Sequence, residues 1–390
     1  MNIIVLGGGI AGVSTAIALR QKGFDVTIYE RHNTEASIGA GIVLWPNAVY
    51  VLKQLGLFDQ VKLLSGCPVK MQRLTNLGEK LGSIDIEFIN ETMGYPSFSI
   101  LRTDFQSVLI AKLRELSITV NYGYNVARIQ NTSNKTEVLF QNGSSISSDI
   151  VIGADGRMAS QARKYVFGEN KAIYQGFINW VGVMEFETDS FREIVVHDYW
   201  GLGARFGIVP ISATMAYWAG GVVSEKIAGN DATYYKNELQ SIFSGWPELV
   251  NTVIAETPLN RINKIYVHDH NPIKTWHKNN VVVIGDAAHA PLPTSGQGAC
   301  QALEDAWHLA NCIASNGTDI NNAFTQFTQL RSAKTANIIA AGRGLASSIF
   351  NTNPEYCKER NLASKKTDYT RVAAGMAQAW SEGLMAVSTA

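Results

Sequence analysis

Three glycines near the start of the chain have the spacing of a phosphate-binding turn. Gly7, Gly9 and Gly12 form G-x-G-x-x-G directly after the apolar run of residues 2–6, which predicts a buried β-strand. The first glycine permits a tight turn, the second lets the backbone approach a pyrophosphate, and the third lets a helix pack close to the strand. The spacing predicts a dinucleotide site with the pyrophosphate at a helix N-terminus.

The residues after this turn complete a βαβ unit. Small and apolar residues recur at helical spacing over 13–22, Gly23 is suited to end the helix, and residues 25–30 form a second predicted strand. Glu30 ends that strand, about 20 residues beyond the glycines, where a carboxylate can accept hydrogen bonds from ribose hydroxyls. The unit predicts dinucleotide binding, and it does not by itself separate FAD from NAD.

Two later turns place an aspartate at the end of an apolar strand. Asp155 and Gly156 follow the strand predicted over 149–152, and Gly285 and Asp286 close the strand predicted over 281–285. Small residues surround both aspartates, so a ligand can come close to the backbone. Asp286 is placed to bond the ribityl hydroxyls of a flavin.

A third glycine-rich segment follows Asp286. Pro293 and the sequence Gly296-Gln297-Gly298 precede a helix predicted to begin near Gln301. Glycines at that position expose backbone N–H groups at the positive end of the helix. These groups can hold the electron-rich O2/N1 edge of a flavin.

The composition indicates a globular protein and excludes several classes. The 390 residues allow two or three domains, 46% of them are apolar, and the 33 basic and 33 acidic side chains balance. Zero net charge gives no sign of a nucleic-acid partner, and no apolar run is long enough for a transmembrane helix. The four cysteines match neither a zinc site nor a disulfide framework, which favours free thiols in the cytoplasm.

The middle and the end of the chain differ in their predicted elements. Residues 70–90 and 174–225 have strand patterns, 103–116 predicts a helix, and 301–345 has a long, alanine-rich helical pattern. The tail over 355–390 is also helical in pattern. We predict a nucleotide-binding domain built from separated segments, with a β-rich second domain inserted into it.

Together these segments resemble the group A FAD monooxygenases, the para-hydroxybenzoate hydroxylase-like family. Arg102 in the segment 101–106 and the Ala-Leu-Glu-Asp-Ala segment 302–306 also match. The resemblance implies an α/β (α+β) fold: a Rossmann-like FAD-binding domain, an inserted β-sheet substrate domain and C-terminal helices. The boundaries it implies are 1–70, 98–172 and 266–345 for the FAD-binding domain, 71–97 and 173–265 for the substrate domain, and 346–390 for the C-terminal helical segment.

The resemblance also implies roles for individual residues. Glu30 holds the adenosine ribose with Arg31 beside the adenine, Arg102 and Gln106 contact the pyrophosphate or ribityl region, and Asp155 is tied to both FAD and NAD(P)H. The implied cofactor-binding set is Gly7, Gly9, Ala11, Gly12, Glu30, Arg31, Gly41, Val43, Arg102, Gln106, Val126, Asp155, Gly156, Gly285, Asp286, Pro293, Gly296, Gln297 and Gly298. One segment departs from the family pattern: residues 156–163 are one residue longer before the serine, so Ser160 and Arg163 match less well than Asp155.

Within the family, the chain is most similar to salicylate hydroxylase-like and FAD-dependent urate hydroxylase-like enzymes. Residues 174–180, and 205–210 followed by Tyr217, carry this likeness. It implies that Arg205 anchors an anionic or carbonyl-bearing ring and that Tyr217 hydrogen-bonds or stacks on it. The alternatives are a surface salt bridge for Arg205 and a packed strand tyrosine for Tyr217.

Other conspicuous residues are given structural roles. His289 is interpreted as a structural histidine beside the flavin site rather than a catalytic one, and the sequence His268-Asp269-His270 lacks further ligands for a metal. Trp45, in the segment 39–47, either walls the active site or packs in the core. No metal is expected.

The activity that the resemblance implies is that of a single-component monooxygenase. NAD(P)H, either NADPH or NADH, reduces FAD, O₂ gives a C4a-hydroperoxyflavin, and a small aromatic or heteroaromatic substrate is hydroxylated. A drug-modifying enzyme of the tetracycline type, or a quinolone or polyketide monooxygenase, is the alternative within the family. An FAD oxidase that does not use NAD(P)H and a non-catalytic FAD-holding protein are more distant alternatives. The sequence leaves open whether the protein is a monomer or a homodimer.

Overall fold

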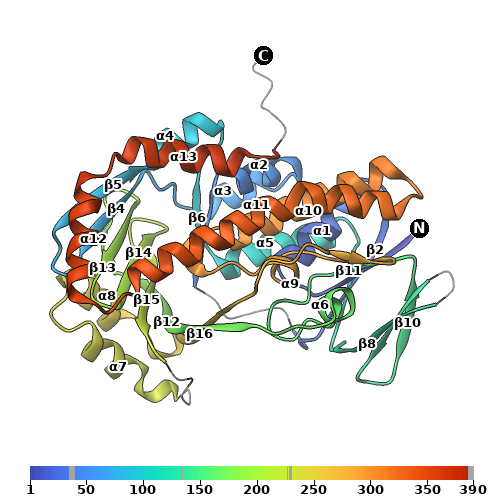
Figure 1. The fold of residues 1–390 in the computed structure, drawn as a ribbon, viewed down its shortest axis with the longest axis horizontal. Helices are drawn as coiled ribbons and strands as arrows, with labels where there is room; N and C mark the ends of the chain where they lie inside the picture. Colours follow the sequence, from blue (N-terminus) through green and yellow to red (C-terminus); the bar gives the residue numbers. More distant parts are fainter. Residues whose placement is uncertain (35–39, 133–134, 226, 228–230, 385–390) are drawn as a thin grey trace.

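The computed structural model describes residues 1–34, 40–132, 135–225, 227 and 231–384. Two β-rich halves lie at opposite ends of the molecule, and long helices run from one half to the other (Figure 1). Both ends of the described chain contribute to this arrangement, because the first strand lies in one half and the last helices lie over the other.

The first half is a six-stranded sheet in the order β17-β18-β11-β1-β2-β7. All neighbours are parallel except the antiparallel pair β17 and β18. β1 is fully buried from Ile3 to Leu6 because helices cover both faces of a parallel sheet. The strands are β1 (Asn2–Leu6), β2 (Asp25–Glu30), β7 (Thr119–Tyr122), β11 (Ile150–Gly153), β17 (His277–Lys278) and β18 (Val281–Val283). The predicted βαβ unit is present, with α1 (Ile10–Gln21) as its helix.

The second half is a seven-stranded sheet in the order β16-β12-β15-β14-β13-β4-β5. Its strands are β4 (Lys70–Thr75), β5 (Lys80–Asp85), β12 (Ile173–Glu185), β13 (Val195–Trp200), β14 (Ala204–Pro210), β15 (Met215–Val223) and β16 (Ile262–Asp269). β4 and β5 come from a segment far from the other five strands in the chain. The boundaries predicted at residues 70 and 266 fall within β4 and β16.

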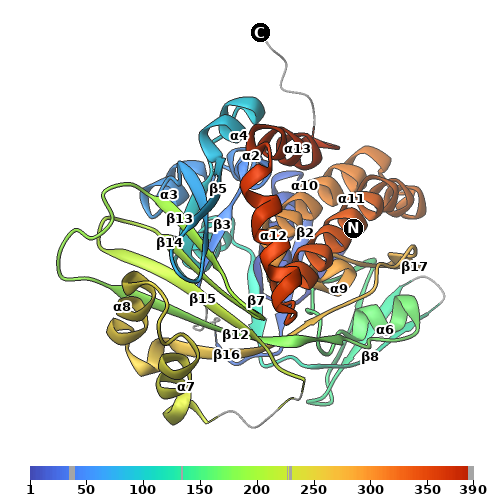
Figure 2. The ribbon, with the colours of Figure 1, turned by 60° about the vertical axis from the view of Figure 1, so that its left-hand side comes forward.

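Alternation along these strands gives the second sheet two different faces. One face carries large buried side chains, including Trp180, Phe206 and Trp218, and packs against α7 (Tyr235–Ile242) and α8 (Glu248–Glu256). Figure 2 shows α7 and α8 on this side, with α11 and α12 on the other. The opposite face carries Arg205 and Tyr217, and it turns toward the first half of the molecule.

The stretch over 301–345, predicted to be helical and long, consists of two helices. α10 (Gly298–Asn316) ends at Gly317, whose positive φ of 57° belongs to a turn, and α11 (Ile320–Ile349) begins after Asp319 accepts a hydrogen bond from the Asn322 amide. Alanine-rich sequence on both sides of the turn hid the break. The predicted helical tail consists of α12 (Pro354–Lys366) and α13 (Tyr369–Ser381).

Shorter elements complete the fold. They are a two-stranded sheet of β3 (Gly41–Leu44) and β6 (Phe98–Leu101), a three-stranded sheet of β8 (Val126–Asn131), β9 (Thr136–Phe140) and β10 (Ser145–Ser148), and the helices α2 (Pro46–Gln54), α3 (Phe58–Leu63), α4 (Ile86–Met93), α5 (Arg102–Glu115), α6 (Gln161–Phe167) and α9 (Asp286–His289). Short 3₁₀ turns complete the list at Ala232–Tyr234, Leu259–Arg261 and Pro293–Ser295. Among the described helices, none is long and apolar enough to cross a membrane.

Candidate functional site

The turn after β1 shows why each glycine of the first motif is needed. A Cβ on Gly7, whose φ is 114°, would lie 2.3 Å from the Ala154 carbonyl oxygen, and a Cβ on Gly12 would lie 2.0 Å from the Gly7 oxygen. A Cβ on Gly9 would meet no protein atom within 4 Å. Gly7 and Gly12 are therefore required by the packing of the protein itself, whereas Gly9 leaves open space in front of the N-terminus of α1.

Glu30 closes the βαβ unit from the end of β2. Its carboxylate accepts hydrogen bonds from the backbone N–H of Gly8 at 2.6 Å and of His32 at 2.8 Å. Gln106 of α5 donates from its side-chain amide to the Gly8 carbonyl oxygen at 2.9 Å. The glycine turn is thus held by two side chains predicted to contact the cofactor.

A cleft of about 220 Å³ opens beside this turn. Nine of the predicted cofactor residues line it, namely Gly7, Gly9, Glu30, Arg31, Arg102, Gln106, Val126, Asp155 and Gly156. The same cleft is lined by residues that the sequence reasoning missed, including Gly8, Tyr29, His32, Tyr122, Tyr124 and Asn125. The predicted residues at 11, 12, 41, 43 and 285–298 are not in its lining, so the cleft corresponds to the nucleotide end of the predicted site.

Asp155 has a local structural role in addition to its place in the cleft. Its carboxylate accepts hydrogen bonds from the Ser160 hydroxyl at 2.5 Å and from the Gln161 and Ala162 amides at 2.8 and 3.1 Å. Ser160 caps α6 by accepting from the Arg163 amide. Burial raises the pKa of Asp155, and these hydrogen bonds oppose that rise. The carboxylate therefore holds the start of α6, which the sequence pattern did not indicate.

The segment that is one residue longer than the family pattern reaches the second aspartate turn. Arg157 Nη1 lies 2.8 Å from Asp286 Oδ2, and both side chains are about one-third exposed, at 35% and 37%. Arg163 is buried and donates to the Ala287 and Ala288 carbonyl oxygens at 3.0 and 3.1 Å. The turns at 155 and 286, separated in the chain, are thereby joined.

The segment predicted to hold the flavin ring lies at the N-terminus of α10. Gly296 has a φ of 63°, and its carbonyl oxygen accepts a hydrogen bond from Trp45 Nε1 at 3.0 Å. α10 starts at Gly298, so its unpaired N–H groups point into this region. Trp45 is 4% exposed and fixes the 296 turn; Gly39, at the start of its predicted segment, lies outside the described residues.

The two halves of the molecule meet where Tyr217 contacts β3. A Cβ on Gly41 would lie 1.9 Å from the Tyr217 ring, so only glycine permits this contact. Tyr217 is 9% exposed, and its hydroxyl has no hydrogen-bond partner among the described residues. Burial raises the pKa of the phenol, while the charge of Arg205 lowers it. The structure therefore keeps Tyr217 protonated at neutral pH.

Arg205 lies on the same face of the sheet and is held by a buried acid. Its Nε donates to Asp198 Oδ1 at 2.6 Å, and the other oxygen of Asp198 accepts from Trp200 Nε1 at 2.9 Å. Asp198 is 2% exposed. Among the described residues, no group accepts from the terminal nitrogens of Arg205. Between Arg205 and Tyr217 the face carries Gly207, where a Cβ would meet nothing closer than 3.9 Å.

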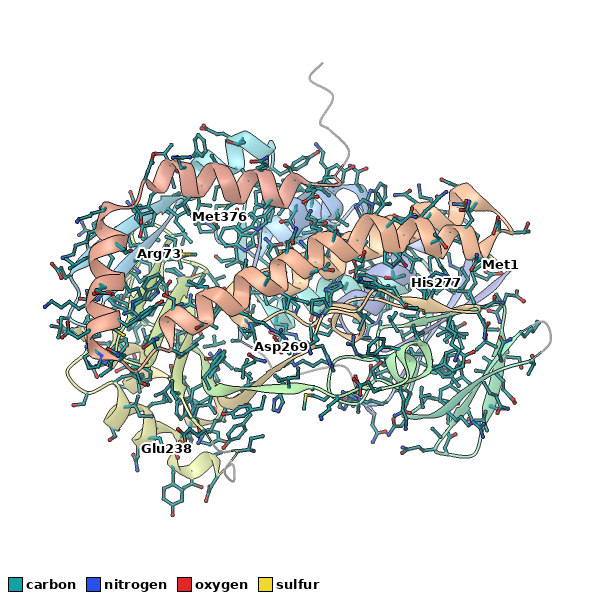
Figure 3. All side chains as sticks on the ribbon, viewed as in Figure 1. Met1, Arg73, Glu238, Asp269, His277 and Met376 are labelled. Atoms are coloured by element: carbon teal, nitrogen blue, oxygen red, sulfur yellow. The ribbon has the colours of Figure 1, made fainter. Side chains whose placement is uncertain are left out.

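His289 and the His268-Asp269-His270 segment, which were given structural roles, are held by protein partners. His289 Nε2 lies 2.5 Å from Asp305 Oδ2, and the same carboxylate oxygen accepts from the Gly285 amide at 2.8 Å. Asp269, between His268 and His270, is paired with both Arg343 Nε and Nη2 at 2.6 and 2.9 Å (Figure 3 labels Asp269 beneath α11). No group of three or more metal-ligating side chains occurs in the described part of the chain.

The residues present fit an FAD molecule. The cleft beside Gly9 suits the nucleotide, the open space at Gly9 suits a pyrophosphate at the start of α1, and the N-terminus of α10 suits the electron-rich edge of the flavin ring. Asp286 follows β18, the neighbour of β11 in the six-stranded sheet, and its partly exposed carboxylate suits ribityl hydroxyls.

Comparison with known proteins agrees with this fit. Residues 1–334 match the family described as the FAD binding domain. The chain belongs to this family. The expected membership among the group A FAD monooxygenases is confirmed by relatives such as the aurachin C monooxygenase/isomerase of Stigmatella aurantiaca, which is 30% identical over 88% of each chain. The FAD-dependent urate hydroxylase of Mycolicibacterium vanbaalenii is 29% identical over 88% of this chain and 87% of its own.

Solved structures of similar proteins share the fold over nearly the whole chain. Klebsiella pneumoniae HpxO complexed with FAD and uric acid matches with a TM-score of 0.90, 27% identity, and coverage of 98% of this chain and 97% of its own. The tetracycline destructase Tet(55) matches with a TM-score of 0.72 at 22% identity over 97% of both chains, which shows a shared fold. The expected mixed α/β fold and an FAD-dependent monooxygenase are therefore established.

Proposed function

We propose that this FAD monooxygenase uses NAD(P)H and O₂ to hydroxylate a small aromatic or heteroaromatic substrate bound between the flavin ring and the seven-stranded sheet. The observation that carries the proposal is the contact of Tyr217 with Gly41. In this contact a side chain of the seven-stranded sheet lies directly against β3, whose Gly41 and Val43 are predicted to bind the cofactor. When bound, FAD supplies the redox chemistry, accepting a hydride from NAD(P)H and activating O₂.

Arg205 is proposed to orient the substrate. Asp198 fixes the guanidinium through Nε, which leaves two parallel N–H donors for the acceptor atoms on one edge of a ring. Because the Asp198 carboxylate balances the charge of the Arg205 guanidinium, the ion pair can bind either a neutral ring carbonyl or an anion whose charge is delocalised over the ring. A urate-like heteroaromatic ring is the first candidate, and the urate hydroxylase relatives favour it.

Tyr217 is proposed to donate a hydrogen bond to the substrate rather than to remove a proton from it. Burial raises its pKa, so the phenol stays protonated at neutral pH and its free hydroxyl can polarise a ring oxygen. Val183 and Val209 flank it on the two neighbouring strands, Val196 lies one strand beyond Val209, and each of the three is at most 8% exposed. These apolar side chains exclude water, which protects the activated oxygen from loss as peroxide.

The test is oxidation of NADPH and NADH by FAD-loaded protein in the presence of urate, other purines, phenolic acids, quinolones and tetracyclines. The proposal predicts that one small aromatic or heteroaromatic compound stimulates oxidation and is recovered as a product heavier by one oxygen atom. Stimulation by a phenolic acid would replace the urate-like ring as the first candidate, and stimulation by a quinolone or a tetracycline alone would reassign the substrate class. Flavin reduction by a substrate without NAD(P)H would identify an oxidase and overturn the proposal.

A further inference from the structure

Four charged side chains are buried together beneath the segment 296–298. Glu304 and Asp305 of α10 face Arg331 and Lys334 of α11, and none of the four is more than 3% exposed. Arg331 bonds both carboxylates, including Asp305 Oδ1 at 2.8 Å. Two acids and two bases therefore balance in a region without solvent, where an unpaired charge would be costly.

Lys334 connects this cluster to the C-terminal helix. Its Nζ donates to the two Glu304 oxygens at 3.0 and 2.9 Å, and to the backbone oxygens of Trp380 and Glu382 at 2.7 Å each. These carbonyl oxygens lie at the C-terminal end of α13, where helix carbonyls lack intrahelical partners and carry partial negative charge. Lys334 thus caps α13 from inside the protein.

The other side of Glu304 faces the segment predicted to hold the flavin ring. Asn47 Nδ2 donates to Glu304 Oε1 at 2.6 Å and to Gln297 Oε1 at 2.9 Å. Hydrogen bonds therefore run from α13 through Lys334, Glu304 and Asn47 to Gln297. Every side chain in this route is buried.

A second contact joins the same two places. The Trp380 ring of α13 packs on the Trp45 ring at 4.8 Å between centroids, and Trp45 Nε1 donates to the Gly296 oxygen. At its other end, α13 packs against the edge of the substrate sheet, where a Cβ on Gly82 would lie 2.0 Å from the Tyr369 ring. Figure 3 labels Met376 in the middle of this helix, which extends across the substrate side of the molecule.

We propose that Lys334 and Trp380 are positioning residues, which use α13 as a brace to hold the 296–298 segment against the flavin ring. The family match ends at residue 334, so α13 lies outside the part of the chain that the match covers. The inference rests on the proposed function for its catalytic consequence. When the brace is loosened, NAD(P)H, a proton and O₂ give NAD(P)⁺ and H₂O₂, and the substrate is left unchanged.

The first experiment separates bracing from simple charge balance. Lys334→Met removes the cap on α13 and also one of the two positive charges that neutralise Glu304 and Asp305. The double variant Lys334→Met with Glu304→Gln removes the cap as well, but leaves one positive and one negative charge, so the cluster is again neutral. Each variant is titrated with FAD by fluorescence, and iodide quenching reports the exposure of the bound flavin. Bracing predicts FAD binding weaker by roughly 2- to 30-fold in both variants, the range for residues in a coupled network. Recovery of wild-type affinity and quenching in the double variant would overturn the proposal.

Trp380→Leu tests the ring contact between Trp45 and Trp380 without changing a buried charge. If the Lys334 variants do not fold, this variant alone tests the brace. It is expected to increase iodide quenching and the H₂O₂ formed per NAD(P)H consumed. Lys365→Met is the matched control, because Lys365 pairs with Glu79 at the exposed surface of α12; it should match the wild type. Unchanged quenching in Trp380→Leu would contradict the brace. Failure of every substrate would affect only the proposed function, since FAD affinity and quenching need no turnover.

Discussion

The cleft beside Gly9, where we expect the nucleotide, and the sheet face that carries Arg205 and Tyr217, the proposed substrate face, differ in how the chain assembles them. The cleft gathers the glycine turn and side chains at the ends of parallel strands, with the first glycine motif and Glu30 lying within 30 residues of each other. The substrate face is formed by side chains, and Asp198, Arg205 and Tyr217 stand on three neighbouring strands. Backbone recognition is specified by local spacing, whereas the side-chain face depends on strand register.

The strongest test of this contrast compares two glycines in one motif. Gly12→Ala places a Cβ 2.0 Å from the Gly7 oxygen and should destabilise the protein by about 1–3 kcal/mol as well as abolish FAD binding. Gly9→Ala meets no protein atom within 4 Å, so the apoprotein should keep its stability while FAD binding is lost. Urea unfolding of the apoproteins and FAD titration measure the two effects. Equal loss of stability in both variants would contradict separate roles.

Asp286 tests whether the cleft continues along the sheet edge toward the flavin ring. Asp286→Ala should give colourless protein with little FAD after purification. Arg157→Gln breaks the same ion pair but keeps the carboxylate, and should retain FAD, because a pair in which both partners are about one-third exposed contributes little. Flavin absorbance per protein is the measurement. Wild-type flavin content in Asp286→Ala would remove Asp286 from the cofactor site.

The substrate face should respond in the opposite way. Arg205→Gln and Tyr217→Phe should keep a full complement of FAD but lower kcat/KM for the substrate, by roughly 10- to 100-fold for Arg205→Gln, as expected for the loss of a charged hydrogen-bond donor. Steady-state kinetics and flavin absorbance on the same preparations give both values. Loss of flavin in Arg205→Gln would show that the two regions are not separable.

A smaller effect concerns the pH dependence of stability, which we trace to the buried His308 of α10. Burial, reinforced by the charge of Arg331, lowers the pKa of His308 to about 4 from 6.5. In the unfolded chain His308 binds a proton below about pH 6.5, whereas in the folded protein it stays neutral down to about pH 4. The free energy of unfolding therefore falls as the pH drops from 6.5 toward 4. Between pH 7 and pH 5 the loss is about 2 kcal/mol. Urea unfolding of the wild type and His308→Gln should show this loss in the wild type only.

Local patterns were enough to predict one region and not the other. The βαβ unit, Glu30 and the turn at Asp286 were predicted because each lies within a short segment with its own spacing. The hydrogen bonds that Asp155 accepts from the first amides of α6 and the break at Gly317 were missed, because a carboxylate beside a glycine, or a glycine among alanines, fits more than one structure. The contacts of Lys334 with Trp380, and of Trp45 with Gly296, join distant segments, and residue spacing carries no signal for them.

The origin of the oxygen atom added to the product decides whether the protein transfers oxygen from O₂ to its substrate. FAD-loaded protein is supplied with NAD(P)H, the stimulating heteroaromatic compound and isotopically labelled O₂, and the product is analysed by mass spectrometry. The account predicts one labelled oxygen atom in the product and close agreement between product formed and NAD(P)H consumed. A product whose added oxygen comes from water, or substrate oxidised with no oxygen added, would contradict a monooxygenase.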